Sequence, residues 1–253
     1  DRHAFLMRLG HHVVAVSDAE RDRLAVRFRR RAGLSAIMNA PNNSPRHRFT
    51  RQDRRPVLPR PCVVAVCGLH KRKGVADIID AFRLVSNDAP DWHLVIAGEG
   101  PERVLLEDQV GRLNLQRRVV FLGYVQDPKP VLQQADIFVL ASYADPCSLV
   151  IGEARSAGCA IVATSVGGTP QMLEFGKAGR LVPPGEPKRL ADELESLMHS
   201  REARKALRSA ALQGAEIFDV QRVAEDYMAV YEKAIARHNG GRRLGATHRP
   251  ATI

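Results

Sequence analysis

From about residue 60 onward, short apolar runs alternate with amphipathic stretches. Five of these runs are rich in β-branched residues and predict buried strands, at residues 61–68, 92–98, 118–123, 136–142 and 159–165. Between them, residues 74–86, 101–113, 128–134 and 148–158 have the composition and spacing of helices. This alternation predicts an α/β fold: a Rossmann-like, doubly wound parallel sheet with helices on both faces.

The chain before this region has a different pattern. Residues 11–39 indicate a strand, a helix and a strand, and Ser17 and Glu20 have the spacing of a capping box at the helix start. One such unit cannot enclose a core. We therefore expect residues 1–44 to be the end of an N-terminal domain whose beginning is absent, and the Pro- and Arg-rich residues 45–59 to be a linker.

The C-terminal region predicts helices and then a tail. We expect the sheet domain to cover residues 60–216, followed by an amphipathic helix at 217–238 that packs back toward the N-terminal domain. Residues 239–253 lack periodicity, which predicts a disordered tail.

Composition narrows the class of protein. The 253 residues carry a formal net charge of +10, which favours polyanionic partners such as phosphates or an anionic membrane surface. Aromatic residues make up only 5% of the chain, so we expect no nucleic-acid partner. The sequence also shows no membrane span and no signal peptide.

The cysteines and histidines indicate neither a disulfide framework nor a metal site. Cys62, Cys67, Cys147 and Cys159 form no CxxC pair, and the nine histidines show no metal-ligand spacing. Reduced cysteines of this kind predict a cytoplasmic protein. We expect no metal and no cofactor.

Candidate chemistry lies where strands lead into helices, because ligands of open parallel sheets bind at the carboxyl ends of the strands. After the first strand of the sheet, Gly68 and Gly74 permit close backbone approach, and residues 70–73 concentrate positive charge at a helix start. An anion would relieve that repulsion. A solvated basic loop explains the same residues equally well.

The segment DPCSLVIGEA, residues 145–154, is the second candidate. Asp145 is expected in a loop and Glu153 in the second turn of the following helix. The backbone amides of Cys147, Ser148, Leu149 and Val150 lie at the start of that helix, where they can bind an anion. Carboxylates accept hydrogen bonds from hydroxyls, so sugar hydroxyls on either side of a diphosphate suit this arrangement.

Two further junctions are glycine-rich. Gly98 and Gly100 in GEGPE, and Gly167 and Gly168 in GGTP, permit tight turns, and Thr169 can cap the next helix. Structural turns explain both sequences, and the first is not a dinucleotide fingerprint.

Several motifs in order resemble one enzyme family. KGVADIIDAF, LVIAGEGPE, FLGYV, ADIFVLAS, the two acids eight positions apart, GGTP and the Tyr-containing final helix are similar to retaining GT-B glycosyltransferases, relatives of sucrose synthase and bacterial glycogen synthase. The resemblance covers roughly residues 10–238. It implies a metal-independent transferase of the hexosyltransferase type, in polysaccharide or glycoconjugate biosynthesis, that uses a UDP- or GDP-sugar.

The resemblance also implies a role for each candidate residue. Glu153 would accept from the ribose hydroxyls, and Asp145 would lie by the donor sugar. The amides of Leu149 and Val150 would meet the diphosphate, those of Cys147 and Ser148 the sugar, and Gly68 would lie in the phosphate loop. Lys73 would neutralise the leaving phosphate. The acceptor is an unknown sugar, lipid-linked or other compound, and the chain alone is expected to bind nucleotide weakly and transfer nothing.

Three positions depart from the family pattern. Asp145 stands where the family usually has Glu, Gly68 where it has a phosphate-binding Arg, and Gln171 where it commonly has an acid. These departures keep a non-catalytic nucleotide-sugar-binding or scaffold relative open as an alternative. A UDP-sugar epimerase of the same fold is a second alternative. Peripheral contact with an anionic membrane is compatible with the basic segments.

Overall fold

The structure is a computed structural model that describes residues 12–28, 33–41 and 56–244. Its centre is a six-stranded sheet in the order β5-β4-β3-β6-β7-β8, in which all neighbouring strands run parallel. The strands are β3 Cys62–Val66, β4 His93–Ala97, β5 Val119–Gly123, β6 Ile137–Leu140, β7 Ala160–Thr164 and β8 Arg180–Val182. The predicted Rossmann-like, doubly wound fold is thus confirmed.

The sixth strand was missed by the sequence analysis. Strand β8 has three residues and pairs with β7, with Leu181 opposite Ala163. A three-residue segment is too short to show a period, so its strand conformation depends on the neighbour that it pairs with.

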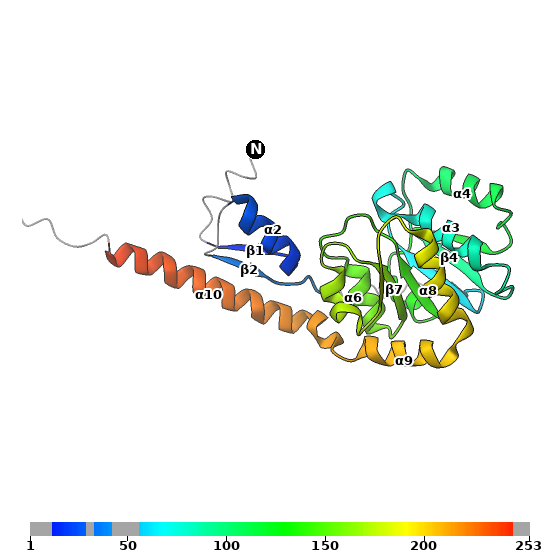
Figure 1. The fold of residues 1–253 in the computed structure, drawn as a ribbon. Coiled ribbons are helices and arrows are strands. Elements are labelled where there is room, and N and C mark those ends of the chain that lie inside the picture. The colour runs from blue at the N-terminus through cyan, green and yellow to red at the C-terminus, as the bar shows by residue number, and fades with distance from the viewer. Residues whose placement is uncertain (1–11, 29–32, 42–55, 245–253) are drawn as a thin grey trace, which may run out of the picture.

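Helices cover both faces of the sheet (Figure 1). They are α3 Val75–Val85, α4 Arg103–Arg112, α5 Lys129–Leu132, α6 Leu149–Ser156, α7 Thr169–Met172, α8 Pro187–His199 and α9 Arg201–Leu212. Alternate residues of β3 enter different cores: Val63 and Ala65 pack with α3, α4 and α8, whereas Cys62 and Val64 pack with α5, α6 and α7. Burial on both faces is the reason why these strands are apolar throughout.

Within the described ranges, three short 3₁₀ helices lie at turns: η1 Lys71–Lys73, η2 Glu174–Gly176 and η3 Ala215–Phe218. Between η1 and α3, Gly74 has a φ of 63°. A Cβ atom at this position would lie 2.0 Å from the carbonyl oxygen of Ala141. Gly74 therefore allows the loop after β3 to contact the loop after β6 through the backbone.

The N-terminal region forms a small unit of its own. Strands β1 Val13–Ala15 and β2 Leu34–Ala36 pair in parallel, and α2 Asp18–Phe28 lies between them in sequence. One half of the expected capping box is present, because the Ser17 hydroxyl accepts from the Glu20 amide at 3.3 Å. The Glu20 carboxylate pairs with Arg23.

The final helix, α10, spans Val220–Leu244 and leads away from the sheet domain (Figure 1). The expectation of a disordered tail from residue 239 is wrong for residues 239–244. Once a helix has formed, each further residue adds a hydrogen bond at little cost in free energy. The helix can therefore extend beyond the residues whose apolar periodicity predicts it. Residues 245–253 lie outside the described part of the chain.

The predicted domain boundaries stay predictions, and most of the expected linker, residues 45–55, also lies outside the described ranges. Among the helices of the described residues, none is long and apolar enough to cross a membrane.

Candidate functional site

The candidate site lies where the direction of strand addition reverses. From β3 the chain adds β4 and β5 on one side, then returns to place β6 on the other side of β3. The loops that follow β3 and β6 diverge at this point, which is where open parallel sheets bind ligands. Here they meet through the backbone, since the Tyr143 amide donates to the Arg72 carbonyl at 2.8 Å.

Lys73 and Asp145 come together at this junction, as parts of the two loops. The Lys73 ammonium donates to Asp145 Oδ2 at 2.5 Å, and the two side chains are 13% and 7% exposed. The sequence analysis predicted both residues for the site but did not predict that they pair.

Helix α6 presents the expected backbone amides. It begins at Leu149, and Ser148 precedes it in an extended conformation with no hydrogen bond from its side chain to the helix start. The first amides of a helix have no acceptor within the helix. The amides of Leu149 and Val150, with those of Cys147 and Ser148 just before them, are thus at the helix end where an anion is favoured.

Glu153 lies in the second turn of α6 and is partly buried. Burial raises the pKa of its carboxyl, and the charge of Asp127 raises it further. Asp127 belongs to the loop between β5 and α5, and the sequence analysis did not single it out. Its position just after a strand was the available signal, because this places it at the same carboxyl edge.

The thiol of Cys67 lies at the end of β3, beside the Lys73–Asp145 pair. Burial raises the pKa of this thiol to about 11, while Lys73 and Arg72 act to lower that pKa and Asp145 to raise it. The loop that carries Arg72 and Lys73 and the loop that carries Asp145 therefore both act electrostatically on this thiol.

Gly68 is exposed in the loop after β3, and His70, Lys71 and Arg72 beside it are exposed as well. A Cβ at Gly68 would lie 3.2 Å from His70 Cδ2, the far end of a side chain. Space alone therefore does not require glycine here.

The glycines of GEGPE have a structural role. Gly98 has a φ of 143°, and a Cβ there would lie 1.9 Å from the Cys67 carbonyl oxygen; a Cβ at Gly100 would lie 2.3 Å from that of Leu69. These contacts hold the loop after β4 against the loop after β3. The turn interpretation of this motif accounts for both positions.

The GGTP segment packs against the backbone of the loop that carries Asp145. The Gly168 amide donates to the Pro146 carbonyl at 3.1 Å, and a Cβ at Gly167 would lie 2.0 Å from the Asp145 carbonyl oxygen. Thr169 is the first residue of α7, and Gly168 occupies the cap position, so the expectation that Thr169 caps this helix is wrong. The close approach of the two loops needs glycine at the cap.

Gln171 connects this segment to the N-terminal unit. Its side-chain oxygen accepts from the Asp18 amide at 3.0 Å, and its side-chain nitrogen donates to Asp18 Oδ2 at 2.7 Å. The neighbouring Ser17 is fully buried, and a Cβ at Gly168 would lie 2.8 Å from Ser17 Cβ. The start of α2 thus packs directly on the loop that supports Asp145.

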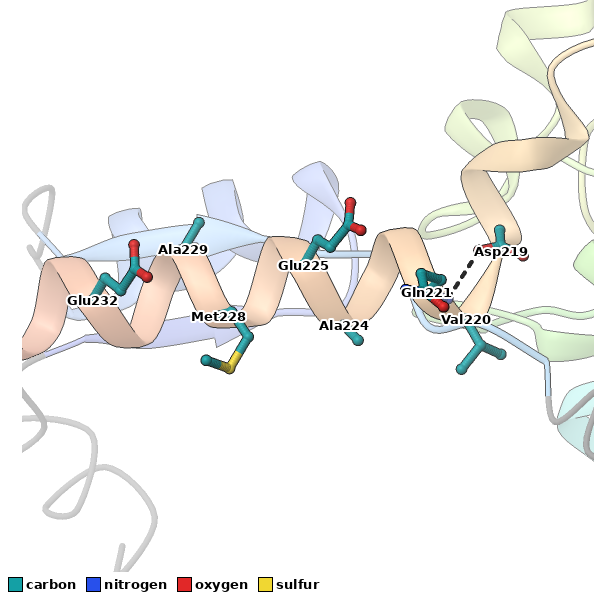
Figure 2. Close-up of a pocket in the computed structure, with 8 residues that line it drawn as sticks. All are labelled: Asp219, Val220, Gln221, Ala224, Glu225, Met228, Ala229 and Glu232. Atoms are coloured by element: carbon teal, nitrogen blue, oxygen red, sulfur yellow. Dashed lines mark hydrogen bonds between the residues drawn. The ribbon is translucent and has the colours of Figure 1, made fainter.

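Two surface hollows of the described residues lie elsewhere, along α10. Figure 2 shows the larger one, of about 690 Å³, where Val220, Ala224 and Met228 project on one side of the helix and Glu225 and Glu232 on the other. A second hollow, of about 430 Å³, lies where the first turns of α10 meet residues 39–41 and Leu149. None of the predicted cationic or acidic site residues lines either hollow, so we assign the site by its chemistry and not by concavity.

No group of three or more His, Cys, Asp or Glu side chains within the described ranges is arranged to hold a metal ion. The four cysteines are free thiols.

Comparison with protein families gives one match that covers most of the chain. The family model described as glycosyl transferases group 1 matches residues 48–213. Among curated proteins, N-acetyl-alpha-D-glucosaminyl L-malate synthase of Bacillus anthracis is 26% identical over 181 residues, covering 71% of this chain and 47% of that protein. Alpha-D-kanosaminyltransferase of Streptomyces kanamyceticus is 27% identical over 243 residues, covering 92% and 62%. The chain thus spans less than two thirds of the length of each relative.

Solved structures share the fold. The crystal structure of HepE from Anabaena in complex with UDP has a TM-score of 0.76 and 24% identity, and the match covers 89% of this chain and 65% of that one. At this identity the likeness shows the fold.

Proposed function

The chain belongs to the group 1 glycosyl transferases, and from this we propose that it carries the donor site of a retaining enzyme that uses a nucleoside-diphosphate sugar. The observation that carries the proposal is the arrangement at the β3/β6 junction. Lys73 pairs there with Asp145, and α6, the helix that follows β6, begins at Leu149 without a side-chain cap and carries Glu153 in its second turn. UDP, present in the HepE structure, is our first candidate for the nucleotide.

Each part of the donor then has a partner of suitable chemistry. The diphosphate lies at the amides of Leu149 and Val150, and the sugar near Asp145 and the amides of Cys147 and Ser148. Glu153 accepts from the ribose hydroxyls, which offsets the cost of burying its charge.

The chemical contribution of the site is electrostatic. Negative charge develops on the diphosphate as the bond to the sugar breaks, and Lys73 together with the helix amides stabilises that charge. These groups are fixed before the reaction, so no metal is required by this mechanism. Transfer to the acceptor, a sugar, lipid-linked or other hydroxyl compound, is proposed to occur in the cytoplasm, with the net charge of +10 favouring contact with anionic membrane surfaces.

Titration of UDP and 2′-deoxy-UDP onto the chain by calorimetry tests the proposal. We expect the wild type to bind UDP, and Glu153→Ala to bind it about tenfold more weakly, because ribose hydroxyls lose their acceptor. We expect 2′-deoxy-UDP to bind the wild type more weakly than UDP, but to bind Glu153→Ala as UDP does.

Glu202→Ala, a change at an exposed acid on α9, is the matched control and should leave both affinities unchanged. Equal binding of UDP by the wild type and Glu153→Ala would contradict the role given to Glu153. Failure of the wild type to bind UDP, GDP or their sugars would contradict the donor-site function.

A further inference from the structure

The Lys73–Asp145 pair differs from the other ion pairs in the described part of the chain. In each of the others at least one of the two side chains is about a third exposed or more, as in Arg155–Glu174 or Arg180–Glu193. In Lys73–Asp145 both side chains are largely buried, and the pair joins two loops 72 residues apart in sequence. Such a pair is tightly coupled, because the loss of either partner leaves a charge with little water around it.

The backbone holds the two loops together independently of this ion pair. Tyr143 and Arg72 are joined by a backbone hydrogen bond, and Gly74 lies against the Ala141 carbonyl. On the other side, Gly167 and Gly168 pack against the backbone of Asp145 and Pro146. Separation of the Asp145 carboxylate from Lys73 would therefore leave these backbone contacts between the loops in place.

We propose that Asp145 is an internal counter-ion of Lys73 that the donor's diphosphate displaces, which frees the carboxylate to accept from the sugar. This inference rests on the proposed function, which places diphosphate and sugar at the same loops. It adds that Lys73 is neutralised before the donor arrives and again after the product leaves. Asp145 thus acts on the diphosphate through Lys73 and on the sugar by direct contact.

The exchange is favourable for electrostatic reasons. A diphosphate carries more negative charge than one carboxylate. It would also accept hydrogen bonds from the amides at the start of α6, in addition to its interaction with the Lys73 ammonium. Lys73 has three N–H donors, and its side chain makes one hydrogen bond among the described residues, to Asp145. Return of the carboxylate to Lys73 opposes rebinding of the product, so the pair assists product release.

The experiment measures binding of inorganic pyrophosphate and UDP to the full chain by calorimetry. Asp145→Asn removes the competing charge at nearly constant size. We expect it to bind pyrophosphate at least about fivefold more tightly than the wild type, and UDP likewise. A gain of affinity is informative because structural damage would weaken binding.

Two further variants separate this effect from the general effect of removing a negative charge near the site. Asp77→Asn removes another acid near these loops, one that accepts from the Tyr143 hydroxyl, and should change the affinity by less than about twofold. In the Lys73→Gln background, adding Asp145→Asn should also change the affinity by less than about twofold, because the lysine that Asp145 neutralises is absent. If Asp145→Asn alone does not fold, a gain in affinity on adding Asp145→Asn to Lys73→Gln still overturns the counter-ion role.

The outcomes distinguish this inference from the proposed function. Unchanged or weaker pyrophosphate binding by folded Asp145→Asn overturns the counter-ion role, as does a gain that persists in the Lys73→Gln background. Tighter pyrophosphate binding by Asp145→Asn, with no binding of UDP by any variant, supports the counter-ion role and contradicts the nucleotide site. If the wild type and Asp145→Asn bind neither ligand, both ideas fail.

Discussion

At the scale of single residues, the site contains charges in places that disfavour them. Glu153 is partly buried on α6 with its pKa raised, first by burial and then by Asp127. Lys73 and Asp145 are largely buried and have each other as partners. Such charges cost stability in the free protein, and a ligand that supplies hydroxyls and phosphates offsets that cost.

Glu153→Gln should stabilise the free chain at neutral pH. A carboxyl whose pKa is raised on folding favours the folded state only while protonated, so its contribution is lost as the pH rises above the unfolded value of about 4.3. The neutral amide avoids this loss. We expect thermal unfolding to show a midpoint about 2 °C above the wild type at pH 7.5 and no difference near pH 3.5.

Glu193→Gln, at an acid of α8 that pairs with Arg180, is the control and should not raise the midpoint at pH 7.5. If the midpoint of Glu153→Gln at pH 7.5 is equal to or below that of the wild type, the ionised Glu153 carboxylate does not destabilise the free protein.

At the scale of elements, one arginine fixes the helix that carries the site. Arg155 of α6 is fully buried and donates to the carbonyls of Met172, Ala211 and Gln213 at 2.8, 3.0 and 2.5 Å. It also pairs with Glu174 at 2.6 Å. Its guanidinium therefore ties α6 to the ends of α7 and α9, and this holds the start of α6 in place at the sheet edge.

Replacement of this side chain should destabilise the domain strongly. Arg155→Met leaves three carbonyls and a carboxylate without their donor, and we expect a loss of about 3–5 kcal/mol in the free energy of unfolding by urea. Arg189→Met on α8, where the side chain is exposed, should cost less than about 0.5 kcal/mol. A loss below about 1 kcal/mol for Arg155→Met would contradict the tie between these helices.

At the scale of the whole molecule, the N-terminal unit is joined to the loops of the site. Ser17 and Asp18 at the start of α2 contact Gly168 and Gln171, and Gly168 in turn binds the Pro146 carbonyl. Glutamine at position 171 suits this junction, because its amide both donates to and accepts from Asp18. A glutamate there would place two carboxylates face to face.

Gln171→Glu should therefore loosen the N-terminal unit. We expect amide hydrogen exchange of α2 to become about tenfold faster at pH 7.5, because the new carboxylate repels Asp18. Adding Asp18→Asn should restore slow exchange, since an amide can donate to the new glutamate. Asp22→Asn, on an exposed part of the same helix, is the control for the second change. Unchanged exchange in Gln171→Glu would exclude this junction as the contact that holds the unit.

Much of the site could be predicted from local sequence. Apolar runs gave the strands, and the capping and turn residues placed Lys73, Asp145 and Glu153 at junctions between elements. Asp127 was missed because its importance comes from proximity to Glu153, which lies in another βα unit. The role of Thr169 was mistaken because close packing of Gly168 on Pro146 decided where α7 begins.

The sequence by itself determined the α/β class, five of the six strands of the sheet and the family, since burial and helical or extended periodicity are properties of neighbouring residues. Only the tertiary structure decided that β3 and β6 lie side by side, that Lys73 pairs with Asp145 and that Gln171 binds Asp18. These contacts join residues 72 and 153 positions apart. They depend on the order in which the chain places its strands in the sheet, and a local sequence pattern does not determine that order.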